Sequence, residues 1–305
     1  MSNIILHSYD ASPFTQRALR MLGIKGLRWR WVKTPMAPPK DDLVRLTGGY
    51  RGTPVMQIGA DIYVDSQLIA AELERRHPDP TLFPAGDQGL AFLLVKFGDA
   101  FFMDSMSLVA ELMSAHFPEP FLEDREHVFG RWGFDALAAR FPQACAQLRA
   151  QAQLLDQQLA DGRPFLTGDA AGLADIQAFS VPWFVRGSLN EIADKLWAGF
   201  DHMAAWEARV DALGEGTREE IGAAEALKEA QKNQSVVRPE VPADDPEGLV
   251  AGAQAEVRPL DTRRGTVRGE LVAAGPNHVA LRNPDSDLSN VVVHFPRLNY
   301  QIHMI

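Results

Sequence analysis

Pro54 stands directly before the apolar segment Val55-Met56-Gln57-Ile58, and it restricts how this part of the chain can fold. Proline lacks a backbone N–H, so within a sheet it is confined to the first residue of a strand or to an edge. An X-Pro bond also adopts the cis form at a cost of only about 0.5–1 kcal/mol. We therefore predict a strand over 55–58 and a cis bond before Pro54, which turns the carbonyl and N–H of Thr53 toward an extended peptide.

Two polar residues, Asp65 and Ser66, stand between a short strand predicted at 61–64 and a helix predicted at 66–76. They place a carboxylate, a hydroxyl and unpaired N–H groups at a helix N-terminus, where negative charge is favoured. This combination suits the amine and carboxylate of an α-amino acid. Together with the backbone of Thr53, it predicts a site for a tripeptide thiol.

The start of the chain predicts a third part of the same site. Ile4-Ile5-Leu6 indicates a buried strand over 4–9, and a helix follows over 13–23. Ser12 is a favoured N-cap residue, and Pro13 suits the first helical position. The sequence therefore predicts a serine hydroxyl at the N-terminus of the first helix.

These motifs, taken in order along the chain, resemble the cytosolic glutathione S-transferase superfamily. They are a strand, Ser12-Pro13-Phe14 at a helix start, Thr53-Pro54 before a strand, and Asp65-Ser66 at another helix start. The resemblance extends over about residues 3–85 and more weakly to about 235. It implies an α+β/α fold class, with an N-terminal thioredoxin-fold, glutathione-binding domain at 1–80 and an all-α C-terminal domain at 88–234.

The second domain carries one further motif of that superfamily. Arg163 to Asp169, followed by Leu173-Ala174-Asp175-Ile176, resembles the family signature before its buried helix. The family has Ser or Thr as the N-cap of that helix, whereas this chain has Gly172, which offers no side-chain acceptor. We expect Asp175 to accept the backbone N–H of residue 172, a role in folding and not in chemistry.

A third region lies outside the two-domain plan of the superfamily. Residues 235–249 are rich in Pro and Asp and are interpreted as a linker. Residues 250–305 alternate short apolar segments with turns such as Gly275-Pro276-Asn277, which predicts three to five antiparallel strands. A β module of this size is marginally stable alone, so we expect it to dock on the body of the protein or on a second subunit. Its role stays open.

The resemblance implies that glutathione is the co-substrate and that Ser12 activates its thiol. A free thiol has a pKa near ~8.5, and a hydroxyl hydrogen bond together with a helix N-terminus favours the thiolate. Tyr9 is a rival hydroxyl, because other branches use a tyrosine near this strand end. Related branches with reductase chemistry have Cys in place of Ser12, so the serine argues against a reductase.

The other site residues also follow from the resemblance. The backbone of Thr53, with Pro54 in cis, pairs with the cysteinyl part of glutathione, and Asp65 and Ser66 hold the γ-glutamyl group. The glycyl carboxylate needs a cation, and Lys40 and Arg51 are both candidates.

The electrophile pocket is expected between the two domains. An aromatic and methionine-rich stretch, with Phe14, suits an apolar guest, and we predict Phe14, Phe101 and Met106 as lining residues. The same residues also suit a core between helices, so this alternative stays open.

Basic and aromatic residues alternate over 27–32, a pattern that also occurs on nucleic-acid-binding surfaces. The net charge of −10 argues against a nucleic-acid partner, because phosphate contacts need a basic face. We interpret 28–33 as an amphipathic edge strand with Trp29 and Trp31 facing a helix.

Composition sets outer limits on the class of protein. The one cysteine, Cys145, excludes an internal disulfide framework, and the scattered histidines have no metal-ligand spacing, so we expect no metal. No apolar run approaches about 18 residues and no signal region precedes the first strand, so we expect a cytoplasmic protein with no membrane partner.

The resemblance thus implies a homodimeric glutathione transferase of the detoxification type, which adds the thiolate to a small apolar electrophile. A glutathione-dependent lyase or isomerase begins with the same attack and stays open as an alternative. A binding or scaffold protein with this fold and little turnover is the alternative from another class.

Overall fold

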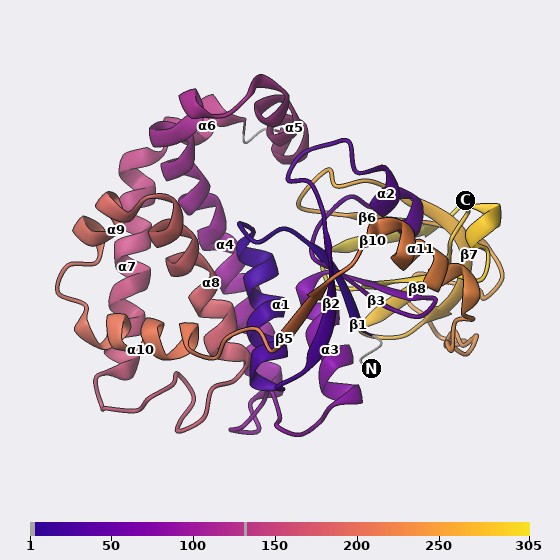
Figure 1. Cartoon of the computed structure of the whole chain (residues 1–305), viewed down its shortest axis with the longest axis horizontal. Coiled ribbons are helices and arrows are strands. Elements are labelled where there is room, and N and C mark those ends of the chain that lie inside the picture. Colours follow the sequence, from indigo (N-terminus) through magenta and orange to yellow (C-terminus); the bar gives the residue numbers. More distant parts are fainter. Residues whose placement is uncertain (1–3, 131–132) are drawn as a thin grey trace.

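The computed structural model describes residues 4–130 and 133–305, and for 95–97 and 100 it describes the backbone alone. In this part of the chain, ten strands form one mixed sheet, in the order β10-β6-β7-β8-β9-β4-β3-β1-β2-β5. Helices α4 to α10 form a separate layer beside the sheet (Figure 1). The fold is therefore α+β with a helical domain, as the sequence predicted.

The centre of the sheet is the thioredoxin-like domain. Strand β1 pairs in parallel with β2 and antiparallel with β3, and β4 follows β3. The bounds of its strands and of the two flanking helices lie within a residue of those predicted: β1 (Ile4–Ser8), α1 (Pro13–Ile24), β2 (Arg28–Lys33), β3 (Val55–Ile58), β4 (Asp61–Val64) and α3 (Ser66–Arg76). Helix α2 (Asp41–Thr47) was not predicted.

The helical domain begins with α4 (Gln88–Met113), the longest of the described helices. The others are α5 (Glu119–Phe129), α6 (Phe134–Ala138), α7 (Phe141–Leu159), α8 (Leu173–Ser188), α9 (Asn190–Leu196) and α10 (Asp201–Asp211). The predicted cap of α8 is confirmed, because the Asp175 carboxylate accepts the Gly172 N–H at 3.0 Å. It also accepts the Leu166 N–H and the Trp206 indole N–H, both at 2.8 Å. These hydrogen bonds link the buried start of α8 to the preceding loop and to α10.

After α10 the chain returns to the sheet. β5 (Thr217–Glu220) pairs in parallel with β2, and α11 (Ala223–Lys232) packs beside it on β2 and α2. The prediction of an edge strand at 28–33 was therefore wrong, and the segment to 234 is not helical throughout. β5 has only four residues, all of them polar or charged, so it shows no apolar periodicity by which a strand could be recognised in the sequence.

The C-terminal module, residues 250–305, adds five antiparallel strands to the described sheet. They are β6 (Gln254–Pro259), β7 (Val267–Ala274), β8 (His278–Arg282), β9 (Val292–Pro296) and β10 (Tyr300–Met304). β9 pairs in parallel with β4, with Ile62 opposite Val293, so the module continues the thioredoxin-like sheet (Figure 1). Ile62, Val64, Val293 and Phe295 belong to one buried cluster.

A buried polar contact accompanies this junction. The Asp61 carboxylate of β4 lies 3.0 Å from Nε2 of His294 in β9 and accepts the Ser235 hydroxyl at 2.5 Å and the Val236 N–H at 3.1 Å. Burial alone would raise the pKa of Asp61, but these hydrogen bonds hold that pKa below its usual value. Asp61 thus ties β4 to the linker and to the module.

Within the described residues, no helix has the length and apolar character needed to cross a membrane.

Candidate active site

The first part of the site is the N-terminus of α1. Ser12 is the N-cap: its Oγ accepts the Thr15 N–H at 3.2 Å, and Pro13 begins the helix. Only 2% of Ser12 is exposed, and its own N–H donates to the Tyr9 carbonyl at 3.2 Å. Because a hydroxyl that accepts one hydrogen bond can still donate its proton, Ser12 keeps a donor for a bound group.

The second part lies at the ends of β3 and β4. The Thr53–Pro54 bond is cis, and Asp65 has φ 72°, a backbone conformation that residues other than glycine rarely adopt. Asp65 is the N-cap of α3, and its Oδ1 accepts the Gln67 N–H at 3.0 Å. A non-glycine residue with a positive φ, as at Asp65, occurs most often at functional sites.

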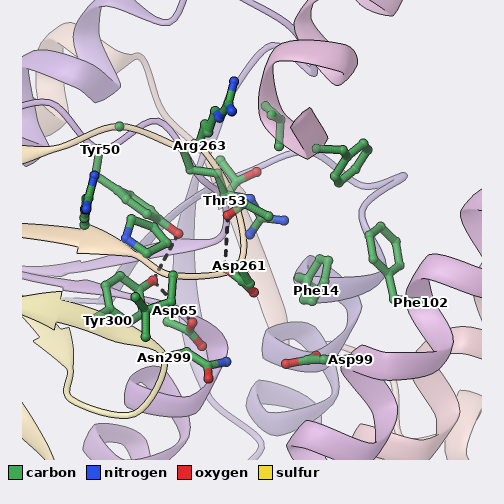
Figure 2. A pocket seen from close by; sticks show the side chains of 18 of the residues that line it. Phe14, Tyr50, Thr53, Asp65, Asp99, Phe102, Asp261, Arg263, Asn299 and Tyr300 are labelled. Atoms are coloured by element: carbon green, nitrogen blue, oxygen red, sulfur yellow. Dashed lines mark hydrogen bonds between the residues drawn. The ribbon is translucent and has the colours of Figure 1, made fainter. Parts of the chain in front are cut away.

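A large cavity of about 990 Å³ lies between these segments and the other two parts of the chain. Figure 2 shows Thr53 and Asp261 facing Phe14 and Phe102 across it. Its lining comes from three parts of the chain: Thr53, Pro54, Asp65 and Ser66 from the thioredoxin-like domain, Asp99, Phe102 and Met103 from α4, and 258–266 with 299–301 from the C-terminal module.

A small cavity of about 50 Å³ adjoins the large one. Ser12 lines the small cavity, together with Tyr9, Lys40, Arg51 and Thr53. Phe14, Thr53, Phe102, Val128, Phe129 and Arg264 line both cavities, so the two form one site. The structure thus brings both candidate hydroxyls, Ser12 and Tyr9, to the same small cavity.

The two candidate cations differ in their surroundings. Arg51 is paired with the Asp124 carboxylate of α5. Lys40 is 8% exposed, its Nζ donates to the Arg51 carbonyl at 3.4 Å, and it lies 5.6 Å from the Tyr9 ring centroid. Burial, and then the nearby Arg125, lower the pKa of Lys40 to about 7. Lys40 is therefore a cation whose charge changes near neutral pH.

The C-terminal module supplies residues that sequence reasoning missed. The Tyr300 hydroxyl donates to Asp65 Oδ2 at 3.3 Å and lies 3.4 Å from the Tyr50 hydroxyl (Figure 2). Burial raises the pKa of the Asp65 carboxyl. The guanidinium of Arg264 stands 5.3 Å from the Phe14 ring centroid. The only local signal for these residues was a polar turn between two strands, and such a turn does not reveal a partner 235 residues away, the separation of Tyr300 from Asp65.

Of the three residues predicted to line the electrophile pocket, one lines the cavities and two do not. Phe14 lines both cavities and meets Phe102 edge to face, with ring centroids 4.9 Å apart. Phe101 and Met106 are absent from the lining of either cavity and pack in two clusters of the helical domain. Neighbouring positions on α4, Phe102 and Met103, line the cavity instead. A shift of helical phase explains the difference, because residues one apart on a helix point about 100° apart.

Family models match two parts of the chain. Residues 6–81 match the N-terminal domain of glutathione S-transferases, and residues 105–218 match a domain of unknown function. No curated protein matches.

Solved structures extend the comparison to the whole chain. A GST-like protein from Pseudomonas syringae is 31% identical with a TM-score of 0.82, over 100% of both chains. The β-etherase LigF from a Sphingobium species (16% identity, TM-score 0.56) covers 69% of this chain and 96% of its own. A glutathione S-transferase from Ceriporiopsis subvermispora, solved with glutathione, has 19% identity and a TM-score of 0.52 over 69% and 97%.

The last two proteins share the fold over about two thirds of this chain, while the Pseudomonas syringae protein also aligns with the C-terminal module. The N-terminal family model spans the strands and helix ends that carry Ser12, Thr53 and Asp65. On this identity over the full length of both chains, the protein belongs to the glutathione S-transferase superfamily.

Proposed function

We propose that this protein binds glutathione, ionises its thiol beside Ser12 and transfers the sulfur to an electrophile. The observation that carries the proposal is that Ser12, Thr53 and Asp65, from three separate segments, line two adjoining cavities. An extended tripeptide thiol needs such an arrangement: a receptor for its amino-acid end, a backbone ladder in the middle and a donor for its sulfur.

Each part of glutathione has a candidate partner. Asp65 and Ser66, at the start of α3, receive the γ-glutamyl amine and carboxylate, and the Thr53 backbone receives the cysteinyl amide. Lys40 receives the glycyl carboxylate, because Arg51 is already paired with Asp124. This assignment makes Lys40, at the start of α2, the preferred cation of the two.

The chemistry at sulfur follows from the surroundings of Ser12. A hydroxyl hydrogen bond, about half a positive charge at the α1 N-terminus and the cations Lys40 and Arg264 all favour thiolate over thiol. The thiol proton leaves to solvent, and a sulfur electron pair forms the C–S bond. In a substitution the leaving group departs with the bonding pair, and in an addition the displaced π pair takes up a proton.

Ultraviolet titration of the thiolate of bound glutathione tests the proposal. We expect the thiol of bound glutathione to ionise about one to two pH units below its free pKa near ~8.5, and Ser12→Ala to lose most of that shift. Tyr9→Phe is the matched control, because it removes the rival hydroxyl from the same cavity. Glutathione that binds with an unshifted pKa, or does not bind, contradicts the proposal and favours a scaffold protein.

A further inference from the structure

The small cavity beside Ser12 is lined by cations from three parts of the chain. They are Lys40 at the start of α2, Arg51 before β3, Arg125 of α5, and Arg264 of the β6–β7 loop. No carboxylate is found among the described residues that line it. A cavity that is rimmed by four basic side chains and lacks an acidic one attracts an anion.

Two of these four cations, Arg51 and Arg125, have partners outside the cavity. The Asp124 carboxylate is paired with both Arg51 and Arg125, and Arg125 also donates to the Met36 carbonyl at 2.7 Å. Arg264 differs from them. In residues 4–130 and 133–305, the ion pairs found with these cations are those of Asp124, and neither Lys40 nor Arg264 takes part in one. The side-chain partner of Arg264 is the neutral Tyr50 hydroxyl.

Arg264 is placed to reach a ligand from either cavity. Within the described lining it is the one basic residue common to both. Its guanidinium lies over the Phe14 ring, and the residue is half-buried. Tyr50 already hydrogen-bonds this guanidinium, and the N–H donors that remain in its plane can bind a bidentate anion such as a carboxylate.

The backbone around Arg264 holds it in this place. Its carbonyl accepts the Arg51 N–H at 2.9 Å, and the N–H of the preceding Arg263 donates to the Val128 carbonyl at 3.0 Å. Gly265 has φ 110°, and a Cβ there would stand 2.2 Å from the Gly49 carbonyl oxygen. The loop is thus pressed against both other domains, and a glycine permits the close approach.

We propose that Arg264 binds a carboxylate carried by the electrophilic substrate, so that this transferase prefers acidic electrophiles to neutral ones. The inference rests on the proposed function, since it assumes that glutathione occupies the remainder of the site. The C-terminal module then acts as a specificity element that reaches across the fold to the reacting sulfur.

The substrate is a better source of that carboxylate than glutathione is. The proposed glutathione contacts already assign both of its carboxylates, to Ser66 and to Lys40. The large cavity has three further arginines: Arg17 is paired with Asp99, Arg258 is bonded to Gln301, and Arg263 lines that cavity alone. Arg264 is therefore the arginine of the large cavity that also lines the cavity of Ser12, and an acidic group on the substrate is assigned to it.

Binding of two glutathione conjugates tests this inference without turnover. The probes are S-(4-carboxy-2-nitrophenyl)glutathione and its carboxamide, which have nearly the same shape and no free thiol. We expect the wild-type protein to bind the acid at least about tenfold more tightly than the amide, as for a charge-assisted bidentate contact. Arg264→Gln should bring the two dissociation constants within about twofold, and Arg264→Lys should recover part of the difference.

Two controls separate the possible failures. Arg268→Gln removes an exposed arginine of β7 that lines neither cavity, and it should keep the wild-type preference. If the wild-type protein binds both conjugates equally, the inference is overturned. If Arg264→Gln weakens both equally together with S-methylglutathione, the inference is also overturned, and Arg264 then serves glutathione itself. If the wild-type protein binds neither the conjugates nor S-methylglutathione, the proposed function fails.

Discussion

At the scale of single residues, the site depends on groups whose charge the fold adjusts. Lys40 is buried near three arginines, so its ammonium loses a proton far more readily than a lysine in water. The pKa of the Asp65 carboxyl is raised instead, because burial favours its neutral form. A ligand that brings a carboxylate to Lys40 and an ammonium to Asp65 restores both charges, which makes the site complementary to a zwitterion.

The binding of S-methylglutathione should therefore depend on pH through Lys40. The pKa of Lys40, lowered to about 7, means that the ammonium is present below that pH and is lost as the pH rises through it. We expect the dissociation constant, followed by calorimetry between about pH 6 and 9, to increase by about three- to tenfold. Lys40→Arg keeps the charge over this range and should flatten the profile. A wild-type profile that is already flat would assign the glycyl carboxylate to another cation.

At the scale of elements, local signals decided which parts of the fold could be predicted. Pro54, Ser12 and Asp65 each mark an element boundary by their own chemistry, so β3, α1 and α3 were predicted within a residue. The pairing of β9 with β4 carries no such signal, because the two strands are both apolar runs and nothing local selects a partner. The predicted site lacked Arg264 and Tyr300 for the same reason. Both belong to the C-terminal module, which the pairing of β9 with β4 places beside the site.

The junction of β4 and β9 should be sensitive to Asp61. Asp61→Ala leaves the Ser235 hydroxyl, the Val236 N–H and the His294 ring without their buried partner. We expect a loss of about 2–4 kcal/mol in the free energy of unfolding, measured in urea at pH 7. Asp287→Ala breaks only an exposed ion pair with Arg45 and should cost under about 1 kcal/mol.

The same variant should change the acid sensitivity of the protein. Because the native pKa of Asp61 lies below its usual value, its contribution is present above about pH 4 and is lost as the pH falls through the native pKa. Asp61→Ala should therefore lose less stability than the wild type on acidification. Equal losses in the two proteins would show that the junction does not depend on this charge.

At the scale of the whole molecule, the C-terminal module is both a wall of the site and a part of the core. Its buried residues pack with Ile62 and Val64 of β4, so one cluster spans the two. A module of this size was expected to dock on the body of the protein, and it does so through a shared sheet, which was not predicted.

Truncation after Asn233 should therefore not release an intact two-domain protein. It removes β6 to β10, uncovers the apolar face of β4 and leaves that strand with unpaired backbone groups. We expect aggregation, measured by light scattering and size exclusion, together with loss of S-methylglutathione binding. A truncated protein that is monodisperse and still binds that ligand would mean that the module serves a partner.

The pairing of Ile62 with Val293 also has a consequence for how the chain is made. Both neighbours that flank the thioredoxin-like strands, β5 and β9, leave the ribosome only after the helical domain, so β2 and β4 emerge long before their partners. During that interval the nascent chain presents two open strand edges, each able to pair with another chain. Synthesis of this protein therefore places an early demand on chaperones, and that demand ends only when the last strands arrive.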